Sequence, residues 1–293
     1  MSATLGDGEC ASAGSGRVVA LRLTSDTRGE SERERVPSLP GAEHALSAVG
    51  PVAMPTGATV ARPLAGELED VVDALTDEGP ATPLKVELAD LLGAWASALV
   101  RVHRHPVDAG TRAAPLPRVL AEEPVPAWVT GLPAGAGHAW AVRAHPATRR
   151  AVDEARTGWS ASQHVHGAAG DDVVVRRDAD HRIGAAQLLS GSATGRGDAR
   201  WDVASALDWI AVVLGPSLDP SWQLDPVADF LAAYRALGGA AEPTRAIAVA
   251  RTIATAVEWS AALIADGASA TDADHEWLAA LWARPLDLVV GGT

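Results

Sequence analysis

The strongest constraint on the fold is a run of apolar residues at helical spacing between positions 84 and 102. Intervals of three and four residues separate Leu84, Leu88, Leu91, Trp95, Leu99 and Val102. Such spacing places these side chains on one face of an α-helix, which must then pack against a core. The basic run at 103–105 suits a helix C-terminus, and Pro106 stops the helix. The pattern therefore predicts a long amphipathic helix that ends near residue 105.

The rest of the chain divides into a β-rich start and a helical remainder. Residues 1–65 are punctuated by glycine and carry strand patterns at 17–24 and within 49–63, and residues 64–67 are expected to form a connector. Two apolar segments, 173–175 and 183–186, flank a polar turn and predict a β-hairpin. Apolar stripes predict further helices within 203–214, 225–237 and 247–264. The proline-rich stretch 106–136 is expected to be irregular.

Composition excludes several classes of protein. At 293 residues the chain is long enough for one large domain or two lobes. Its formal net charge of −13 argues against general nucleic-acid binding and against docking on an anionic membrane. A single cysteine, Cys10, excludes an intrachain disulfide and a multi-cysteine metal site. The sequence shows no secretory signal and no apolar run near the roughly 18 residues of a membrane span, so we expect a cytoplasmic protein.

The stretch HGAAGDDVVV at 166–175 carries the candidate chemistry. His166 opens it, and a histidine is suited to proton transfer near neutral pH. Asp171 and Asp172 supply two carboxylates later in the same stretch. His164, His166 and this aspartate pair are one conceivable metal-ligand set. The alternative is that His166 packs and hydrogen-bonds structurally, and we favour it over a metal site.

Five segments, taken in order, resemble the aminoglycoside phosphotransferase and choline kinase family. They are ALRL (20–23), LLGAWASALVRVHRHP (91–106), HVHGAAGDDVVV (164–175), GDARWDVA (197–204) and FLAAYRALGG (230–239). GDARWDVA, close to the family's Gly-Asp-Pro-x-x-Asp-Leu-Ala, is the most specific of the five. The resemblance implies an α+β, two-lobed protein-kinase-like fold with a reduced β-rich N-lobe at 1–66 and a mainly helical C-lobe at 67–293. It also implies that Asp198 and Asp202 cap a helix and brace the catalytic loop.

The same resemblance identifies the catalytic groups that this chain lacks. Ala168 stands in the place of the carboxylate that orients or deprotonates the acceptor hydroxyl. Gln187 stands in the place of a metal-binding aspartate, and its neutral amide is a poor ligand for Mg²⁺. The loop's metal-binding asparagine falls at Asp172 or Asp171, and Arg22 takes the place of the basic residue that faces the nucleotide phosphates. We therefore expect no ATP-dependent phosphotransfer and no cofactor, ATP and Mg²⁺ included.

Two functions remain open at this point. In the first, the chain is a catalytically degenerate, phosphotransferase-like protein that binds a precursor peptide or a partner biosynthetic enzyme. It resembles the degenerate family members that act in the biosynthesis of ribosomal modified peptides, such as thioamitides and class V lanthipeptides. That resemblance implies assistance in dehydration or thioether cyclisation, with His166 handling protons. In the second, the chain is an active small-molecule or peptide kinase whose catalytic carboxylates are displaced to Asp171 or Asp172.

Overall fold

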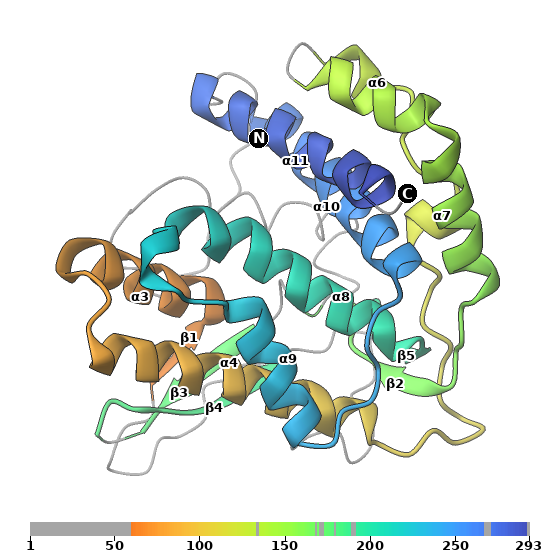
Figure 1. The fold of residues 1–293 in the computed structure, drawn as a ribbon. Helices are drawn as coiled ribbons and strands as arrows, with labels where there is room; N and C mark the ends of the chain where they lie inside the picture. The colour runs from red at the N-terminus through yellow and green to blue at the C-terminus, as the bar shows by residue number, and fades with distance from the viewer. Residues whose placement is uncertain are drawn as a thin grey trace.

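The protein combines long helices with two small antiparallel sheets, which is the α+β class expected from the sequence. The computed structural model describes residues 60–132, 135–167, 169, 173–178, 180–188, 192–266 and 271–291. The strand expected at 17–24, together with Arg22, lies outside the described residues. The described chain begins at strand β1 (Val60–Pro63) and ends in helix α11 (Asp272–Val290) (Figure 1).

Helix α4 (Thr82–His103) confirms the helix predicted from the apolar spacing. It packs against a three-stranded antiparallel sheet in the order β1-β3-β4. Strands β3 (Val173–Arg177) and β4 (Ile183–Leu188) form the predicted hairpin, in which Val173 pairs with Leu188 and Val174 with Gln187. The two strands are therefore paired up to the first residue of β3, which directly follows the 166–172 stretch.

The expected connector at 64–67 is wrong, because these residues form the first turn of helix α3 (Leu64–Glu78). Buried side chains of α3 recur every three or four residues: Leu64, Leu68, Val71 and Leu75. This spacing is visible in the sequence, but Gly66 in the first turn resembles a break. The boundary drawn between two lobes at residue 66 therefore falls inside a helix.

A partly buried ion cluster joins α3, α4 and the hairpin. Arg177 of β3 donates from Nε to Glu67 Oε2 at 2.8 Å, and its Nη2 also contacts Glu87 of α4. The Glu67 side chain is fully buried. The hydrogen bond from Arg177 to Glu67 raises the pKa of Arg177, so the guanidinium stays charged. A buried carboxylate that loses its cation is strongly destabilising, so Arg177 fixes the hairpin between the two helices.

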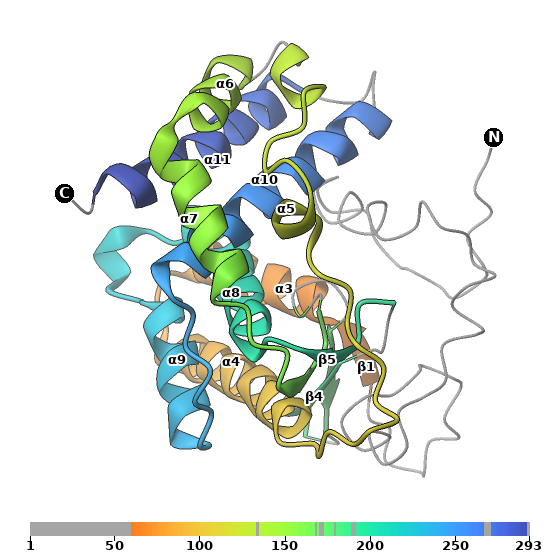
Figure 2. The same cartoon turned by 90° about the vertical axis from the view of Figure 1, so that its right-hand side faces the viewer.

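Helix α8 (Ala199–Trp209) lies between two hydrophobic clusters (Figure 1). The first cluster contains α3, α4, the sheet and α9 (Pro226–Ala236). The second contains α5 (Arg118–Ala121), α6 (Ala136–Ala144), α7 (Pro146–Thr157), α10 (Arg245–Asp266) and α11. Val203 of α8 joins the first cluster, and Trp201 and Ala204 join the second. Figure 2 shows α7 packed across α10 and α11.

Short elements connect these helices. They are the 3₁₀ turns η2 (Val129–Gly131), η4 (Gly215–Ser217) and η5 (Pro220–Trp222), the π-helical segment η3 (Ile210–Leu214), and the paired strands β2 (Gln163–Val165) and β5 (Gly195–Gly197). The three helices predicted in the second half are confirmed as α8 with η3, α9 and α10. Helices α6, α7 and α11 were not predicted. The stretch 106–136 is largely irregular, as expected, and is interrupted by α5 and η2.

Helix α10 is the one described helix that is long and apolar enough to cross a membrane, over Arg245–Ala265. In this fold 61% of that window is buried inside the protein. It packs against α7, α8 and α11. Its apolar character is therefore accounted for by its place in the second hydrophobic cluster.

Candidate functional site

The candidate site is the loop that follows strand β2, of which His166, Gly167 and Ala169 are described. Gly167 has a φ of +86°, a conformation that side chains other than glycine rarely adopt. A Cβ at this position would lie 2.5 Å from both the Cβ and the carbonyl oxygen of Ala193. The turn after His166 therefore requires glycine, for reasons of both conformation and space.

The carboxylate of Asp202 holds the backbone of this loop. Its Oδ2 accepts a hydrogen bond from the backbone N–H of His166 at 2.7 Å, and its Oδ1 accepts one from Gly167 at 2.7 Å. Asp202 lies on the first turn of α8 and is completely buried. Two charge-assisted bonds from adjacent amides fix the direction in which the loop leaves β2. The bracing role that the resemblance implies for Asp202 is thus present in the geometry.

A chain of polar groups extends from Asp202 into the core. His103, the last residue of α4, lies with Nε2 3.1 Å from Asp202 Oδ2 and Nδ1 2.8 Å from the hydroxyl of Tyr234. A neutral His103 with its proton on Nε2 donates to Asp202 and accepts from Tyr234, which satisfies all three groups. Burial raises the pKa of Tyr234 to about 12, and the negative charge of Asp202 adds to this effect. The network joins α4, α8 and α9 directly beneath the loop.

Two further hydrogen bonds fix the loop from other sides. The Thr194 hydroxyl donates to the carbonyl of His166 at 3.3 Å. The indole Nε1 of Trp95, in the middle of α4, donates to the carbonyl of Ala169 at 3.1 Å. Ala169 and Trp95 are both fully buried. The loop is therefore held at three of its described residues by side chains from α4, α8 and the segment before β5.

Asp198 caps helix α8, as expected. Its Oδ1 accepts from the backbone N–H of Arg200 at 3.0 Å, and its Oδ2 accepts from Ser160 at 2.9 Å. The guanidinium of Arg200 also donates to Asp198, and this interaction raises the pKa of Arg200. A capped helix start matters here because Asp202 lies in the first turn of the same helix, so the cap fixes the position of the carboxylate beneath the loop.

The structure places only part of the predicted site. His166 is described and is buried, at 1% exposure of the residue. Gln187 lies in β4 opposite Val174, at the end of the hairpin nearest the loop. Ala168, Asp171 and Asp172 lie outside the described residues, as does Arg22.

The described contacts of His164 are with the segment after α4, and Asp171 and Asp172 lie outside the described residues. His164 lies with Nε2 3.0 Å from the carbonyl oxygen of Pro106, and its ring stacks edge-on against His105 at 4.7 Å. Burial lowers the pKa of His164, and the neighbouring His105 adds to the effect. Within the described part of the chain no group of three or more His, Cys, Asp or Glu is placed to hold a metal ion.

Comparison with known proteins assigns no family. No protein-family model, no curated protein and no solved structure matches this chain. These comparisons therefore add nothing to what the sequence and the geometry of the loop indicate about function.

The sequence did not reveal three members of the site. Trp95 and Tyr234 look like ordinary core residues of their helices, and His103 looks like a basic residue suited to a helix C-terminus. Trp95 bonds to the loop, His103 to Asp202, and Tyr234 to His103, all through side-chain polar atoms. A single-helix pattern does not distinguish such atoms. The signal that did exist is the resemblance of the segment 91–106 to a family helix that ends in Leu-His-Arg.

Proposed function

We propose that this chain is a catalytically degenerate, phosphotransferase-like protein with a two-lobed kinase-like fold, which binds a precursor peptide or a partner enzyme in the cytoplasm. One observation carries the proposal: Asp202 braces the backbone of His166 and Gly167 immediately before Ala168. This is the bracing implied for a phosphotransferase loop, next to a position that has lost its carboxylate. A scaffold kept without its reacting group fits a binding role better than phosphoryl transfer.

The remaining features of the loop region support the same proposal. Gln187 belongs to the strand that returns to the loop, and its amide takes the place of a metal-binding carboxylate. The net charge of −13 favours a neutral or basic peptide over an acidic one. Within this role the chain assists dehydration or thioether cyclisation of a ribosomal peptide, and His166 is the candidate group for proton transfer.

Calorimetric titration of the full chain with Mg-ATP tests the loss of phosphotransfer. We expect no heat of binding in the micromolar range and no nucleotide turnover. The A168D/Q187D double variant, which restores both carboxylates, should gain affinity for Mg-ATP. Micromolar binding with turnover in the unmodified chain would instead identify an active kinase with displaced carboxylates and would overturn the proposal.

Co-expression with a candidate precursor peptide tests whether the chain assists modification of a ribosomal peptide. Each dehydration removes one water from the peptide, which mass spectrometry counts directly. We expect the modified peptide only when this chain is present, and less of it with H166N. H181N is the matched control, because His181 is exposed, lies in the turn of the hairpin and has a positive φ that asparagine tolerates. An unchanged product in the absence of the chain would contradict the assignment.

A further inference from the structure

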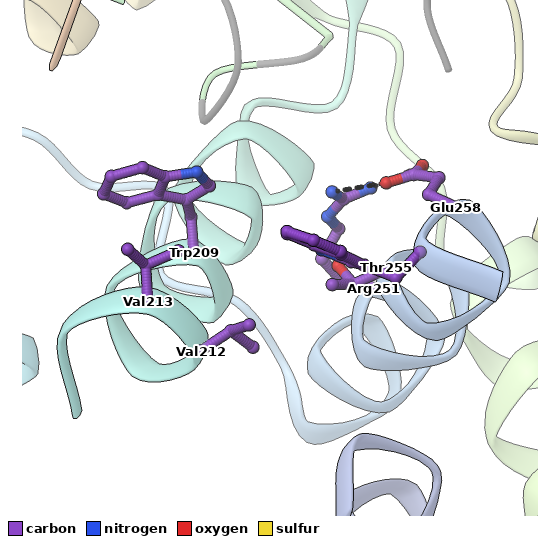
Figure 3. Close-up of a pocket in the computed structure, with 7 residues that line it drawn as sticks. Trp209, Val212, Val213, Arg251, Thr255 and Glu258 are labelled. Atoms are coloured by element: carbon purple, nitrogen blue, oxygen red, sulfur yellow. Dashed lines mark hydrogen bonds and ion pairs between the residues drawn. The ribbon is translucent and has the colours of Figure 1, made fainter. Parts of the chain in front are cut away.

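A second site lies at the opposite end of α8, between the π-helical segment η3 and α10. Figure 3 shows Trp209, Val212 and Val213 on one wall, and Arg251, Thr255 and Glu258 on the other. Trp259 completes the lining, and the atom-free space is about 250 Å³ including its open mouth. Trp209 follows Asp202 by seven positions on α8, which is about 10 Å along the helix axis. The pocket is therefore distinct from the loop site.

In the described part of the chain, two uncharged buried polar atoms of this pocket have no hydrogen-bond partner. They are the indole Nε1 of Trp209 and the hydroxyl of Thr255. Trp209 is 6% exposed and Thr255 is 5% exposed, so bulk solvent does not satisfy either group. Neighbouring hydroxyls on α10 behave differently: Thr252 donates to Asp208 at 2.8 Å and Ser260 to the Ala256 carbonyl at 2.7 Å. An unpaired buried donor is destabilising, so two on one pocket point to a missing acceptor.

The two charged residues of the pocket, Arg251 and Glu258, pair with each other. Arg251 donates to both carboxylate oxygens of Glu258, at 3.1 and 3.0 Å. Its guanidinium also lies over the ring of Trp201, 5.6 Å from the centroid. A charged ligand would have to break this bidentate pair, whereas a neutral ligand leaves it intact. Apart from the Thr255 hydroxyl and the indole N–H groups, the rest of the lining is apolar and consists of two valines and two indole rings.

The backbone of the first wall is also unusual. Ile210–Leu214 forms a π-helical segment directly after Trp209. Such segments are rare and occur frequently at functional sites. The innermost part of the pocket has room for about one water molecule. A larger ligand must therefore displace the half-buried side chains of Val213 and Trp259.

From these observations we propose that the pocket between η3 and α10 binds a neutral, mainly apolar small molecule that carries one hydrogen-bond acceptor oxygen, such as an aryl ketone or amide. The oxygen accepts from Trp209 Nε1 and from the Thr255 hydroxyl. The apolar body lies among Val212, Val213 and Trp259. The Arg251–Glu258 pair forms a neutral edge at the mouth. This proposal is independent of the function of the loop site.

An NMR titration that follows the ¹⁵N-labelled indole N–H resonances tests the proposal directly. Acetophenone is the probe, and ethylbenzene, which lacks the oxygen, is the control ligand. The chain has ten tryptophans, and loss of one resonance in W209F assigns Trp209. We expect acetophenone to shift the Trp209 resonance saturably in the millimolar range, as suits a ligand of roughly nine non-hydrogen atoms. Ethylbenzene should bind about tenfold more weakly. No saturable shift, which would mean that the pocket holds only water, or equal affinity for the two probes would overturn the proposal.

The variant T255V tests the second donor. It removes an unpartnered hydroxyl and keeps the side-chain volume, so the protein should fold normally. Affinity for acetophenone should fall roughly three- to tenfold. T76V is the matched control, since Thr76 lies on α3, is exposed and bonds only to the Val72 carbonyl. Unchanged affinity for acetophenone in T255V would contradict the proposal. The comparison of acetophenone with ethylbenzene uses the unmodified chain, so it tests the proposal even if a variant fails to fold.

Discussion

Asp202 is the residue on which the loop site depends most. Its two carboxylate oxygens accept from His166, Gly167 and His103, and the residue is shielded from bulk solvent. In D202N one oxygen becomes an NH₂ group that faces an N–H donor, so at least one buried donor loses its partner. We expect D202N to lower the free energy of unfolding by roughly 2–4 kcal/mol, measured by denaturant titration.

The control for D202N is D153N. Asp153 lies on α7 with a side chain 57% exposed and pairs only with Arg156. Its replacement should change the free energy of unfolding by less than about 0.5 kcal/mol. Equal small effects in D153N and D202N would mean that the carboxylate is not what holds the loop.

Tyr234 gives the protein a clear response to high pH. It is the only tyrosine in the chain, so tyrosinate absorbance reports this residue alone. In the folded protein its pKa is raised to about 12, against about 10 when unfolded. At pH 11 we therefore expect about a tenth of the phenol to be ionised in the native protein and about nine tenths in guanidinium chloride.

The same shift predicts the direction of stability. Because the folded pKa of Tyr234 lies above the unfolded one, its contribution is fully present below about pH 10 and is lost as the pH rises through about 12. That contribution is roughly 2–3 kcal/mol. A native titration midpoint near 10 would show that Tyr234 is not buried against His103.

At the scale of elements, the loop turn and helix α4 make opposite demands on glycine. In G167A the methyl group would need a positive φ and would meet the Ala193 carbonyl at 2.5 Å. Gly93, inside α4, has nothing within 4 Å of the position that its Cβ would take. We expect G167A to cost roughly 2–4 kcal/mol, and G93A to stabilise the protein by about 0.5–1 kcal/mol. Thermal denaturation of the two variants checks that G167A destabilises the protein and that G93A stabilises it. An unchanged stability in G167A would contradict the described turn.

The elements that were predicted from the sequence share a clear apolar period. Helices α4, α9 and α10 and the β3–β4 hairpin carry regular stripes or paired apolar segments. Helix α7 was missed because its buried residues are few and small: Thr148, Val152 and Ala155. Helix α11 contains Pro285, which in a sequence indicates a break. These helices form through packing against α10, and a local pattern does not carry that information.

Only those parts of the site that a single segment carries could be predicted from the sequence. Asp198 and Asp202 belong to a short motif, so their cap and brace could be expected from one segment. The contacts of Trp95 with Ala169 and of His103 with Tyr234 join positions 74 and 131 residues apart. No spacing rule connects such positions without the fold. The unpartnered Trp209 and Thr255 likewise belong to two helices, and their meeting depends on how α8 crosses α10.

At the scale of the whole molecule, α8 joins the two hydrophobic clusters. Val203 is fully buried in the first, which contains α3, α4, α9 and the sheet. Trp201 and Ala204 of the same helix are buried in the second, with α7, α10 and α11. A chain with two clusters can unfold in two steps, unless an element shared by both couples them. Because α8 belongs to both, we expect the described part of the chain to unfold as one unit.

Hydrogen exchange of paired core variants tests this coupling. V203A weakens the first cluster and V152A, on α7, weakens the second, each by about 1–2 kcal/mol. If the clusters unfold together, each variant should lower the protection of the slowest amides in α4 and in α11 by the same factor. Independent clusters would instead lose protection separately, in α4 for V203A and in α11 for V152A. The protection of α8 would then follow the weaker cluster, because its amides exchange as soon as either of its two faces is exposed.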